Sequence, residues 1–146
     1  MSLNNIFDIA GSGMNAQSVR LNTTASNIAN AESASSSSEA VYRGRHPVFA
    51  ASYNQLLGNP GSIAGNPDQA SVGVGVTGIV ESEAPLQMRH EPHHPLADEE
   101  GYVYYPIVNV VEEMTNMISA SRSFQVNVEI MNSAKQMVQR VLTLGQ

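Results

Sequence analysis

The sequence has 146 residues, the length of one compact domain, but only 5% of them are aromatic and none is Trp, so the bulky anchors of an ordinary core are scarce. Its formal net charge of −6 rests on 13 acidic and 7 basic side chains, of which one is Lys. Because nucleic-acid affinity depends on Lys and Arg neutralising phosphates, this balance argues against DNA or RNA binding. The absence of cysteine excludes disulfides, thiolate metal sites and cysteine nucleophiles.

The first 31 residues predict a long helix with one apolar seam. Steps of four and three residues from Leu3 give a 3.5-residue period, which is typical of a helix that faces a partner helix. The seam consists of Leu3, Phe7, Ala10, Met14, Gln17, Leu21, Thr24, Ile28 and Ala31. Away from the seam the only charges are Asp8 and Arg20, and small uncharged polar residues fill the rest. Such residues suit a surface that is covered on several sides.

Three Asn residues lie near the end of this predicted helix. We expect Asn22, Asn27 and Asn30 to form interhelical hydrogen bonds. Capping of the helix by Asn30 is an equally physical interpretation.

The middle of the chain predicts loops around a thin β module. Residues 32–40 are rich in Ser and predict a mobile loop. The Gly-Asn-Pro runs within 58–61 and 65–68 are strong turn signals. The acidic trio at 98–100, followed by Gly101, is typical of a solvated turn before a strand.

Three segments of this middle predict strands. Residues 41–53 alternate loosely, and residues 72–80 carry a β-branched side chain at nearly every other position. Residues 102–105 could pair with 72–80. The expected module has two to four strands and is too thin to be stable without the helices.

After Pro106 a second long helix is predicted, from 109 to 144. Its seam consists of Val110, Met114, Met117, Ser121, Phe124, Val128, Met131, Lys135, Val138 and Leu142. A second apolar set (Val111, Ile118, Val126, Ile130, Ala134, Met137, Val141) indicates contact with more than one helix. At roughly 1.5 Å per residue the helix would be about 50 Å long. The predicted fold class is α+β, with long N- and C-terminal helices packed as a coiled-coil-like pair and a small β module between them.

Two motifs match known signatures but lack the required context. Gly73, Gly75 and Gly78 satisfy the dinucleotide-binding pattern, yet the β pattern continues through them instead of opening a helix. His90 and His94 satisfy the zinc-protease pattern, but Pro92 lies between them and is incompatible with the helix that this site needs. We therefore predict no dinucleotide site, no catalytic zinc and no other cofactor.

Export and membrane signals are also informative. No window approaches 18 consecutive apolar residues, so no membrane span is expected. The first positive side chain is Arg20, which follows a stretch rich in Asn and Ser, so a cleaved secretory signal is not expected either.

Segments on both sides of the β module resemble the axial proteins of the bacterial flagellum, the rod and hook family. The resemblance covers nearly the whole chain and rests on residues 12–17, 20–31, 42–43, 94–103, 108–114 and 117–122. The short middle points to a proximal rod member over the longer distal rod and hook subunits. Two departures are Ile107, where the family pattern has Asn after Pro106, and the loop 59–69, which is peculiar to this sequence.

The resemblance implies a structural subunit without enzymatic activity or small-molecule substrate. It implies a position in the periplasmic rod, where the subunit transmits torque from the motor to the hook. It further implies partners that are other copies of the chain and other rod proteins, and export through the flagellar type III apparatus without signal cleavage. The chain would then divide into an N-terminal assembly helix (1–31), a Ser-rich loop with the β module (32–107) and a C-terminal assembly helix (108–146).

We predict an assembly interface along both helices, at Leu3, Phe7, Met14, Leu21, Asn27, Ile28, Asn30, Val110, Met114, Met117, Ile118, Phe124, Val128, Met131, Val138 and Leu142. Our hypothesis is that both terminal segments are largely disordered in the free monomer and fold on docking. An intramolecular helical hairpin is the alternative. A cytoplasmic coiled-coil adaptor would need charged flanking positions that the first helix lacks, and a hydrolase or dinucleotide binder would need the two rejected motifs.

Overall fold

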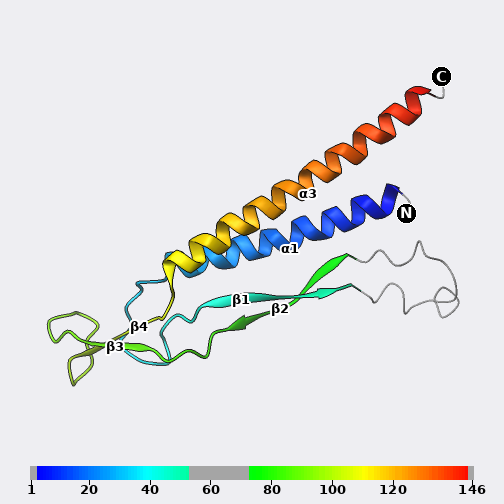
Figure 1. Cartoon of the computed structure of the whole chain (residues 1–146). Coiled ribbons are helices and arrows are strands. Elements are labelled where there is room, and N and C mark those ends of the chain that lie inside the picture. Colours follow the sequence, from blue (N-terminus) through cyan, green and yellow to red (C-terminus); the bar gives the residue numbers. More distant parts are fainter. Residues whose placement is uncertain (1–2, 53–72, 145–146) are drawn as a thin grey trace, which may run out of the picture. The chain divides into compact units, whose positions relative to one another are not determined.

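A computed structural model describes residues 3–52 and 73–144 (Figure 1). The elements in chain order are α1 (Leu3–Ala29), β1 (Arg45–Ala51), β2 (Val74–Glu81), β3 (Gln87–His90), β4 (Tyr102–Tyr105) and α3 (Val110–Leu144). The predicted α+β class and both long helices are confirmed. The turns predicted at 58–61 and 65–68 lie outside the described residues.

Local hydrogen bonds explain where α1 ends and where α3 begins. Asn30 caps the C-terminus of α1, because its backbone N–H and its side-chain Nδ2 both donate to the carbonyl of Ser26, at 3.1 and 2.8 Å. Asn109 caps the N-terminus of α3, where its Oδ1 accepts from the backbone N–H of Val111 at 3.1 Å and of Glu112 at 3.4 Å. Both helix boundaries are therefore set by Asn side chains.

The four strands form two separate two-stranded sheets. β1 pairs with β2, and the bonds that flank this pair, Ser52 N–H to Gly73 carbonyl (2.9 Å) and Ser82 N–H to Gly44 carbonyl (2.7 Å), show that it is antiparallel. The β2 strand runs through the Gly-rich motif, as predicted.

The second sheet corrects the predicted pairing of 102–105 with 72–80. β4 pairs antiparallel with β3, a strand that the sequence did not predict, with Met88 opposite Tyr104 and His90 opposite Tyr102. The turn at 98–101 brings β4 back onto β3, because Asp98 Oδ1 accepts the N–H of Tyr102 at 2.8 Å and Gly101 adopts φ +81°. A local turn thus decides the partner of β4.

The Ser-rich segment 32–40 is attached to this second sheet. The backbone N–H and carbonyl of Ser35 both bond to Tyr104, at 2.9 and 3.0 Å, on an isolated bridge. The expectation that this whole segment forms a mobile loop without packing is therefore wrong at Ser35.

Contacts divide the chain into two compact units. Unit 1 comprises residues 1–19, 48–78 and 120–146, and unit 2 comprises residues 20–47 and 79–119. Both units take residues from both helices and from the β segments, since α1, α3, β1 and β2 each continue from one unit into the other.

In unit 1 small residues let the two helices approach closely. Ala10, Ala16, Ala120 and Ala134 are buried. A Cβ atom placed on Gly13 would lie 2.9 Å from Nδ2 of Asn127, so the two helices contact each other at this glycine. In the same unit α1 also contacts the start of β2, where the N–H of Val74 donates to Oγ of Ser12 at 3.1 Å.

In unit 2 the end of α1 is bound to the start of β1 by Asn27, which is 0% exposed. Its Nδ2 donates to the carbonyl of Arg45 (2.9 Å), and its Oδ1 accepts from the N–H of Arg45 and from the hydroxyl of Tyr42, both at 2.8 Å. Arg45 also pairs with Glu81 of β2 at 3.0 Å. We call these four residues the Asn27 junction.

Removal of the Asn27 amide should destabilise unit 2. Asn27→Ala removes a fully buried amide and leaves the backbone N–H and carbonyl of Arg45 and the hydroxyl of Tyr42 without this partner, so we expect a loss of about 2 to 4 kcal/mol in the free energy of unfolding. Tyr42→Phe removes one hydroxyl and should cost about 1 kcal/mol. Urea unfolding followed by tyrosine fluorescence measures both, because the chain has no Trp.

Asn22→Ala is the matched control, since Asn22 lies on the same helix but is exposed. Its effect should stay within about 0.5 kcal/mol. Equal effects of Asn27→Ala and Asn22→Ala would contradict the role that we assign to the junction.

Candidate assembly surfaces

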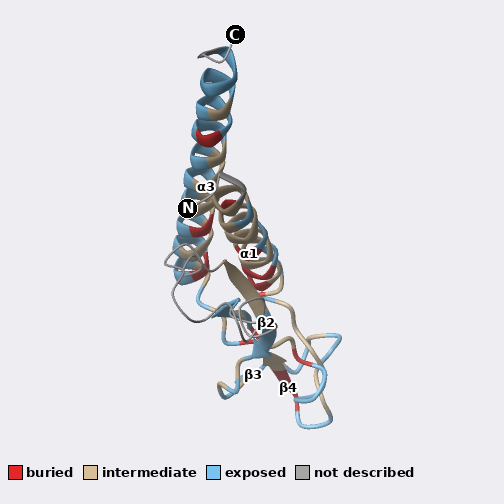
Figure 2. Ribbon diagram, turned by 90° about the vertical axis from the view of Figure 1, so that its right-hand side faces the viewer, coloured by how far each residue is buried: buried red, intermediate tan, exposed pale blue. Residues whose placement is uncertain are grey.

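Helix α3 has one covered face and one exposed apolar face. Its covered positions recur every three or four residues, at Val110, Glu113, Met117, Ala120, Phe124, Asn127, Met131, Ala134 and Val138. The exposed apolar positions are Val111, Met114 and Ile118 in unit 2 and Val126, Ile130, Met137, Val141 and Leu142 in unit 1. Figure 2 shows the result as a C-terminal part of α3 that is mostly exposed.

A polar stripe completes the surface of α3 in unit 1. Exposed polar side chains recur there at Arg122, Gln125, Glu129, Asn132, Gln136 and Gln139. The helix therefore offers water a polar stripe and an apolar face at the same time. The apolar face is the part that a monomer leaves without a partner.

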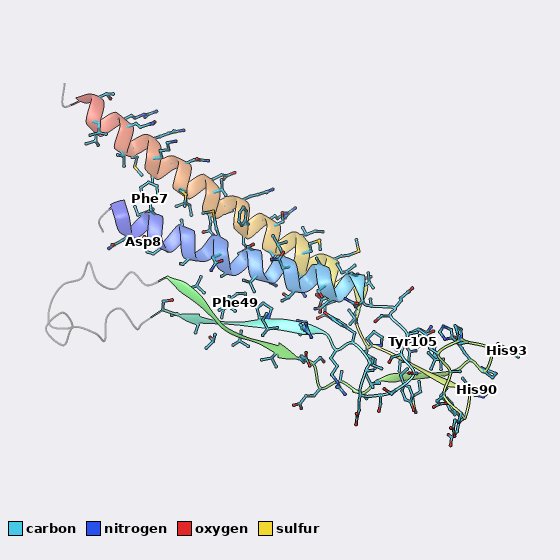
Figure 3. All side chains as sticks on the ribbon, turned by 180° about the vertical axis from the view of Figure 1, so that it is seen from behind. Phe7, Asp8, Phe49, His90, His93 and Tyr105 are labelled. Carbon is cyan, nitrogen blue, oxygen red and sulfur yellow. The ribbon has the colours of Figure 1, made fainter. Side chains whose placement is uncertain are left out.

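The predicted interface residues fall into three groups. Those that are partly covered within the chain are Phe7, Met14, Leu21, Ile28, Val110, Met117, Phe124, Val128, Met131 and Val138. Those that are exposed are Met114, Ile118 and Leu142. The side chain of Leu3 lies outside the described part. In Figure 3 the Phe7 ring lies on the side of α1 that faces α3, whereas Asp8 points away from α3.

The interhelical hydrogen bonds predicted for Asn27 and Asn30 are wrong. Asn27 is fully buried and bonds to Tyr42 and Arg45, which follow α1 in the chain. Asn30 bonds to its own helix, so the capping interpretation is the correct one for this residue. Asn30 finds a local backbone partner in its own helix, whereas Asn27 bonds to the segment that starts β1, 18 residues further along the chain.

Two interhelical contacts were not predicted from the sequence. One is the close approach at Gly13 and Asn127 in unit 1. The other is in unit 2, where NH2 of Arg20 donates to Oδ1 of Asn116 at 2.9 Å. Glycine in a helix with no turn beside it is the signal that could have indicated the first contact.

Neither of the two rejected motifs has the helix that its signature requires, and β2 runs through the Gly-rich one. His90 ends β3, and residues 91–97 form turns without a helix, as the prolines predicted. His90 contacts the ring of Tyr102 at 5.1 Å between centroids, and Nδ1 of His94 accepts the N–H of Leu96 at 3.1 Å. Among residues 3–52 and 73–144 no group of three or more potential ligands could hold a metal ion.

A polar cavity of about 490 Å³ lies in unit 2 beside the Asn27 junction. Its lining includes Glu39, Arg43, Arg45 and Glu81. Arg45 is paired with Glu81, and NH1 of Arg43 donates to the carbonyl of Ser82 at 3.2 Å. Both guanidinium groups in the cavity lining therefore have partners within unit 2.

Among the described residues, Tyr105 in the second sheet has a shifted pKa. Burial raises the pKa of its phenol, and the negative charge of Glu91 raises it further. The Tyr105 hydroxyl donates to Oε2 of Glu91 at 3.3 Å, and Arg89 lies over its ring at 4.7 Å from the centroid. A raised phenol pKa keeps the hydroxyl protonated, which suits a structural hydrogen bond.

The two ends of the chain each match a known protein family. Residues 7–32 match the family model described as flagella basal body rod protein, and residues 99–144 match that of the flagellar basal body rod FlgEFG protein C-terminal region. The flagellar basal-body rod protein FlgC of Salmonella typhimurium is 47% identical over 146 residues, and that of Escherichia coli O157:H7 is 49% identical, with both chains fully covered in each case. The chain belongs to the FlgC family of flagellar basal-body rod proteins.

The similarity to FlgC extends to distant bacteria. FlgC of Borreliella burgdorferi is 34% identical over 154 residues and covers the whole of this chain and 99% of its own. Members of the FlgC family are structural components of the flagellar basal body, and the chain is a structural subunit of the rod that assembles with other rod components. Full-length agreement with FlgC favours this identification over the adaptor and the distal rod or hook alternatives. In the described part, no helix is long and apolar enough to cross a membrane.

A pair of cysteines tests the helix contact of unit 1 in a chain that has none of its own. Gly13→Cys with Asn127→Cys should form a disulfide readily on mild oxidation, because a Cβ on residue 13 would lie 3.2 Å from Cγ of Asn127. Non-reducing gel electrophoresis of assembled rods measures the bond. A monomer of altered mobility indicates a contact within one chain, and a dimer indicates a contact between chains.

Gly11→Cys with Asn127→Cys is the matched control, since a Cβ on Gly11 would meet nothing within 4 Å. We expect the monomeric product for residues 13 and 127 and little product for the control pair. Dimers as the main product would contradict the intramolecular contact.

Proposed function

We propose that this rod subunit polymerises through its two terminal helices and thereby transmits torque from the flagellar motor to the hook. The observation that carries the proposal is the apolar face of α3 that remains exposed in the isolated chain. Ile130, for example, is 44% exposed although it lies in the middle of the C-terminal part of the helix. Exposed apolar surface costs roughly 25 cal/mol per Å², and neighbouring subunits would remove that cost.

The covered face of α3 supports the same proposal. Phe124, Met131 and Val138 are partly covered within the chain, so the first apolar stripe already has a neighbour. The second stripe then needs helices from other copies or other rod proteins. A subunit that uses one stripe for itself and one for its neighbours combines the intramolecular helix pair with assembly.

Location and export form a further part of the proposal. We assign the chain to the periplasmic rod and infer that it is exported unfolded through the flagellar type III apparatus without signal cleavage. These assignments rest on the family resemblance. The small β module and the scarcity of bulky core residues also support passage of an unfolded chain, because little stable structure would have to be undone.

The free monomer should be ordered unevenly. The first turns of α1 and the C-terminal half of α3 have few buried side chains and depend on packing, so they should be largely disordered before docking. The Asn27 junction holds the end of α1 by several buried hydrogen bonds, so order should persist there. Folding of the helix ends would then be coupled to addition at the growing rod.

Amide hydrogen exchange on the purified monomer measures this gradient. We expect protection near residues 23–31, where Asn27 joins α1 to Arg45 and Tyr42 by three hydrogen bonds. We expect little protection in residues 5–19 and 122–142, where mainly small apolar side chains such as Ala16 and Ala134 are buried. Strong protection throughout 3–31 and 110–142 would contradict folding on assembly.

Charge substitution on α3 tests the assembly face. Phe124→Asp should leave secretion measurable but stop rod completion and swimming, because it places a carboxylate on the covered stripe. Ile130→Asp should have the same effect although the isolated chain leaves this residue exposed. Immunoblots of exported protein, electron microscopy of basal bodies and swimming in soft agar measure the three steps.

Gln136→Asp is the matched control, because it adds the same charge on the polar stripe of the same helix. We expect it to retain at least about half of the normal swimming diameter, since exposed polar positions tolerate charge. Normal swimming of Ile130→Asp would count against the assembly face.

A further inference from the structure

The β3–β4 hairpin of unit 2 has one face that is exposed but not polar. Residues directly opposite each other in a sheet point to the same side, so Met88 with Tyr104 and His90 with Tyr102 form one face. Met88 is 61% exposed and Tyr102 is 37% exposed. We call these four residues the hairpin face. In Figure 3, His90 lies toward the turn end of the hairpin and Tyr105 toward its base.

The opposite side of the hairpin is partly covered. Val103 is 0% exposed and Arg89 lies over the ring of Tyr105, although Gln87 and Arg89 are themselves exposed. An antiparallel sheet with one covered face normally has short polar or charged side chains on the other. Here the outer face has Met88, His90 and two Tyr, and of these residue types Met and Tyr are enriched in protein interfaces.

The backbone of the hairpin limits the way in which a partner contacts it. Both the N–H and the carbonyl of Tyr104 that point away from β3 are bonded to Ser35. Addition of a further strand at this position of β4 is therefore blocked. At this position of β4 a partner would therefore contact the hairpin through side chains.

Charge identifies the kind of partner. Unit 2 carries the entire net charge of −6, and unit 1 is neutral by its charged side chains. From Glu81 to Glu113 there are eight acids and one base, Arg89, which lies over the ring of Tyr105 on the side opposite the hairpin face. Glu99 and Glu100, in the turn that leads into β4, are exposed. A complementary surface would therefore be basic, with an apolar centre.

A second copy of the chain does not supply such a surface. Two hairpins carry like charges and repel each other. The bases of α3 in unit 1 are Arg122, Lys135 and Arg140, spread over 18 residues with Glu129 among them, so they form no cluster. Phosphate-rich nucleic acid and anionic lipid are repelled by the same acids.

We propose that the hairpin face docks a different protein of the basal body, one whose contact surface presents Lys or Arg side chains around an apolar centre. The inference rests on the proposed function, because it needs the chain to be assembled in the rod. The Met88 and Tyr102 side chains supply the apolar contact. Glu99 and Glu100 supply the charge that selects the partner and speeds its association.

Photocrosslinking in purified basal bodies tests the proposal. A benzophenone amino acid replaces Tyr102 in one strain and the more exposed Met88 in another, so that a folding defect of one variant does not decide the result. We expect both to give an adduct with a protein other than this chain, at a peptide that has Lys or Arg beside the crosslinked residue. Mass spectrometry of the adduct identifies the protein and the peptide.

Charge reversal provides the second measurement. Glu99→Lys with Glu100→Lys should lower the adduct yield at least about fivefold, with an unchanged amount of the chain in the basal bodies. Glu39→Lys is the matched control, an exposed acid of unit 2 outside the hairpin, and should leave the yield unchanged. An unchanged yield in the double variant would overturn the role of charge.

Other outcomes of the crosslinking are also decisive. Adducts only with a second copy of the chain, adducts that muramidase digestion converts to a glycan fragment, or no adduct at either position would overturn the docking proposal while the chain remains in the rod. Absence of the unsubstituted chain from basal bodies would contradict the proposed function itself, and the docking proposal would fall with it.

Discussion

The central constraint on this protein is that α3 has more apolar surface than the rest of the chain covers. Its covered stripe contacts α1 at Asn127, which lies against Gly13, while Val126, Ile130, Met137 and Val141 are left exposed. A helix of 35 residues with two apolar stripes is stable only if both find neighbours. The short β module adds little core of its own. In our proposal, neighbouring subunits cover the second stripe, and the helix ends of the free subunit fold fully only on assembly.

Against that background the Asn27 junction fixes the chain where it changes from helix to strand. One side-chain amide satisfies both backbone groups of Arg45 and the hydroxyl of Tyr42. Such buried polar groups specify one arrangement, because any other pairing leaves donors and acceptors without partners. In the second sheet, Asp98 likewise fixes one arrangement, because its Oδ1 accepts the N–H of Tyr102 at the start of β4. Unit 2 is thus held by a few directional hydrogen bonds, whereas the helices in unit 1 pack through small apolar side chains.

The sequence predicted the helices well because their pattern is repeated over many turns. The 3.5-residue period located both helices within two residues of their observed ends, and the β-branched run located β2. The pairing of the strands was harder to predict from the sequence. Gln87–His90 has no clear alternation, and its partner β4 is chosen by the Asp98 turn and not by strand composition. Residue roles were the least accessible, since Asn27 and Gly13 act through contacts with segments distant in sequence.

The candidate surfaces show the same division. The second apolar set on α3 indicated more than one neighbour, and the structure leaves all of it exposed except Ala134. The hairpin face gave no signal in the sequence, because Met88, His90 and Tyr102 come together only through the register of β3 with β4. A short strand has too few repeats for its exposed face to be predicted from sequence. The face can be identified only when the pairing of the strands is known.

Arg45 joins three parts of unit 2 in parallel. Its backbone is bonded to α1, its guanidinium is paired with β2, and the same group lies 5.7 Å from the ring centroid of Tyr42. Tension applied along the end of α1 would reach both strands through this residue, and the bonds would be strained together instead of one after another. Bonds loaded together resist rupture better than bonds that open in sequence. Under the torque load that we propose for the rod, Arg45 would couple the end of α1 to both β1 and β2.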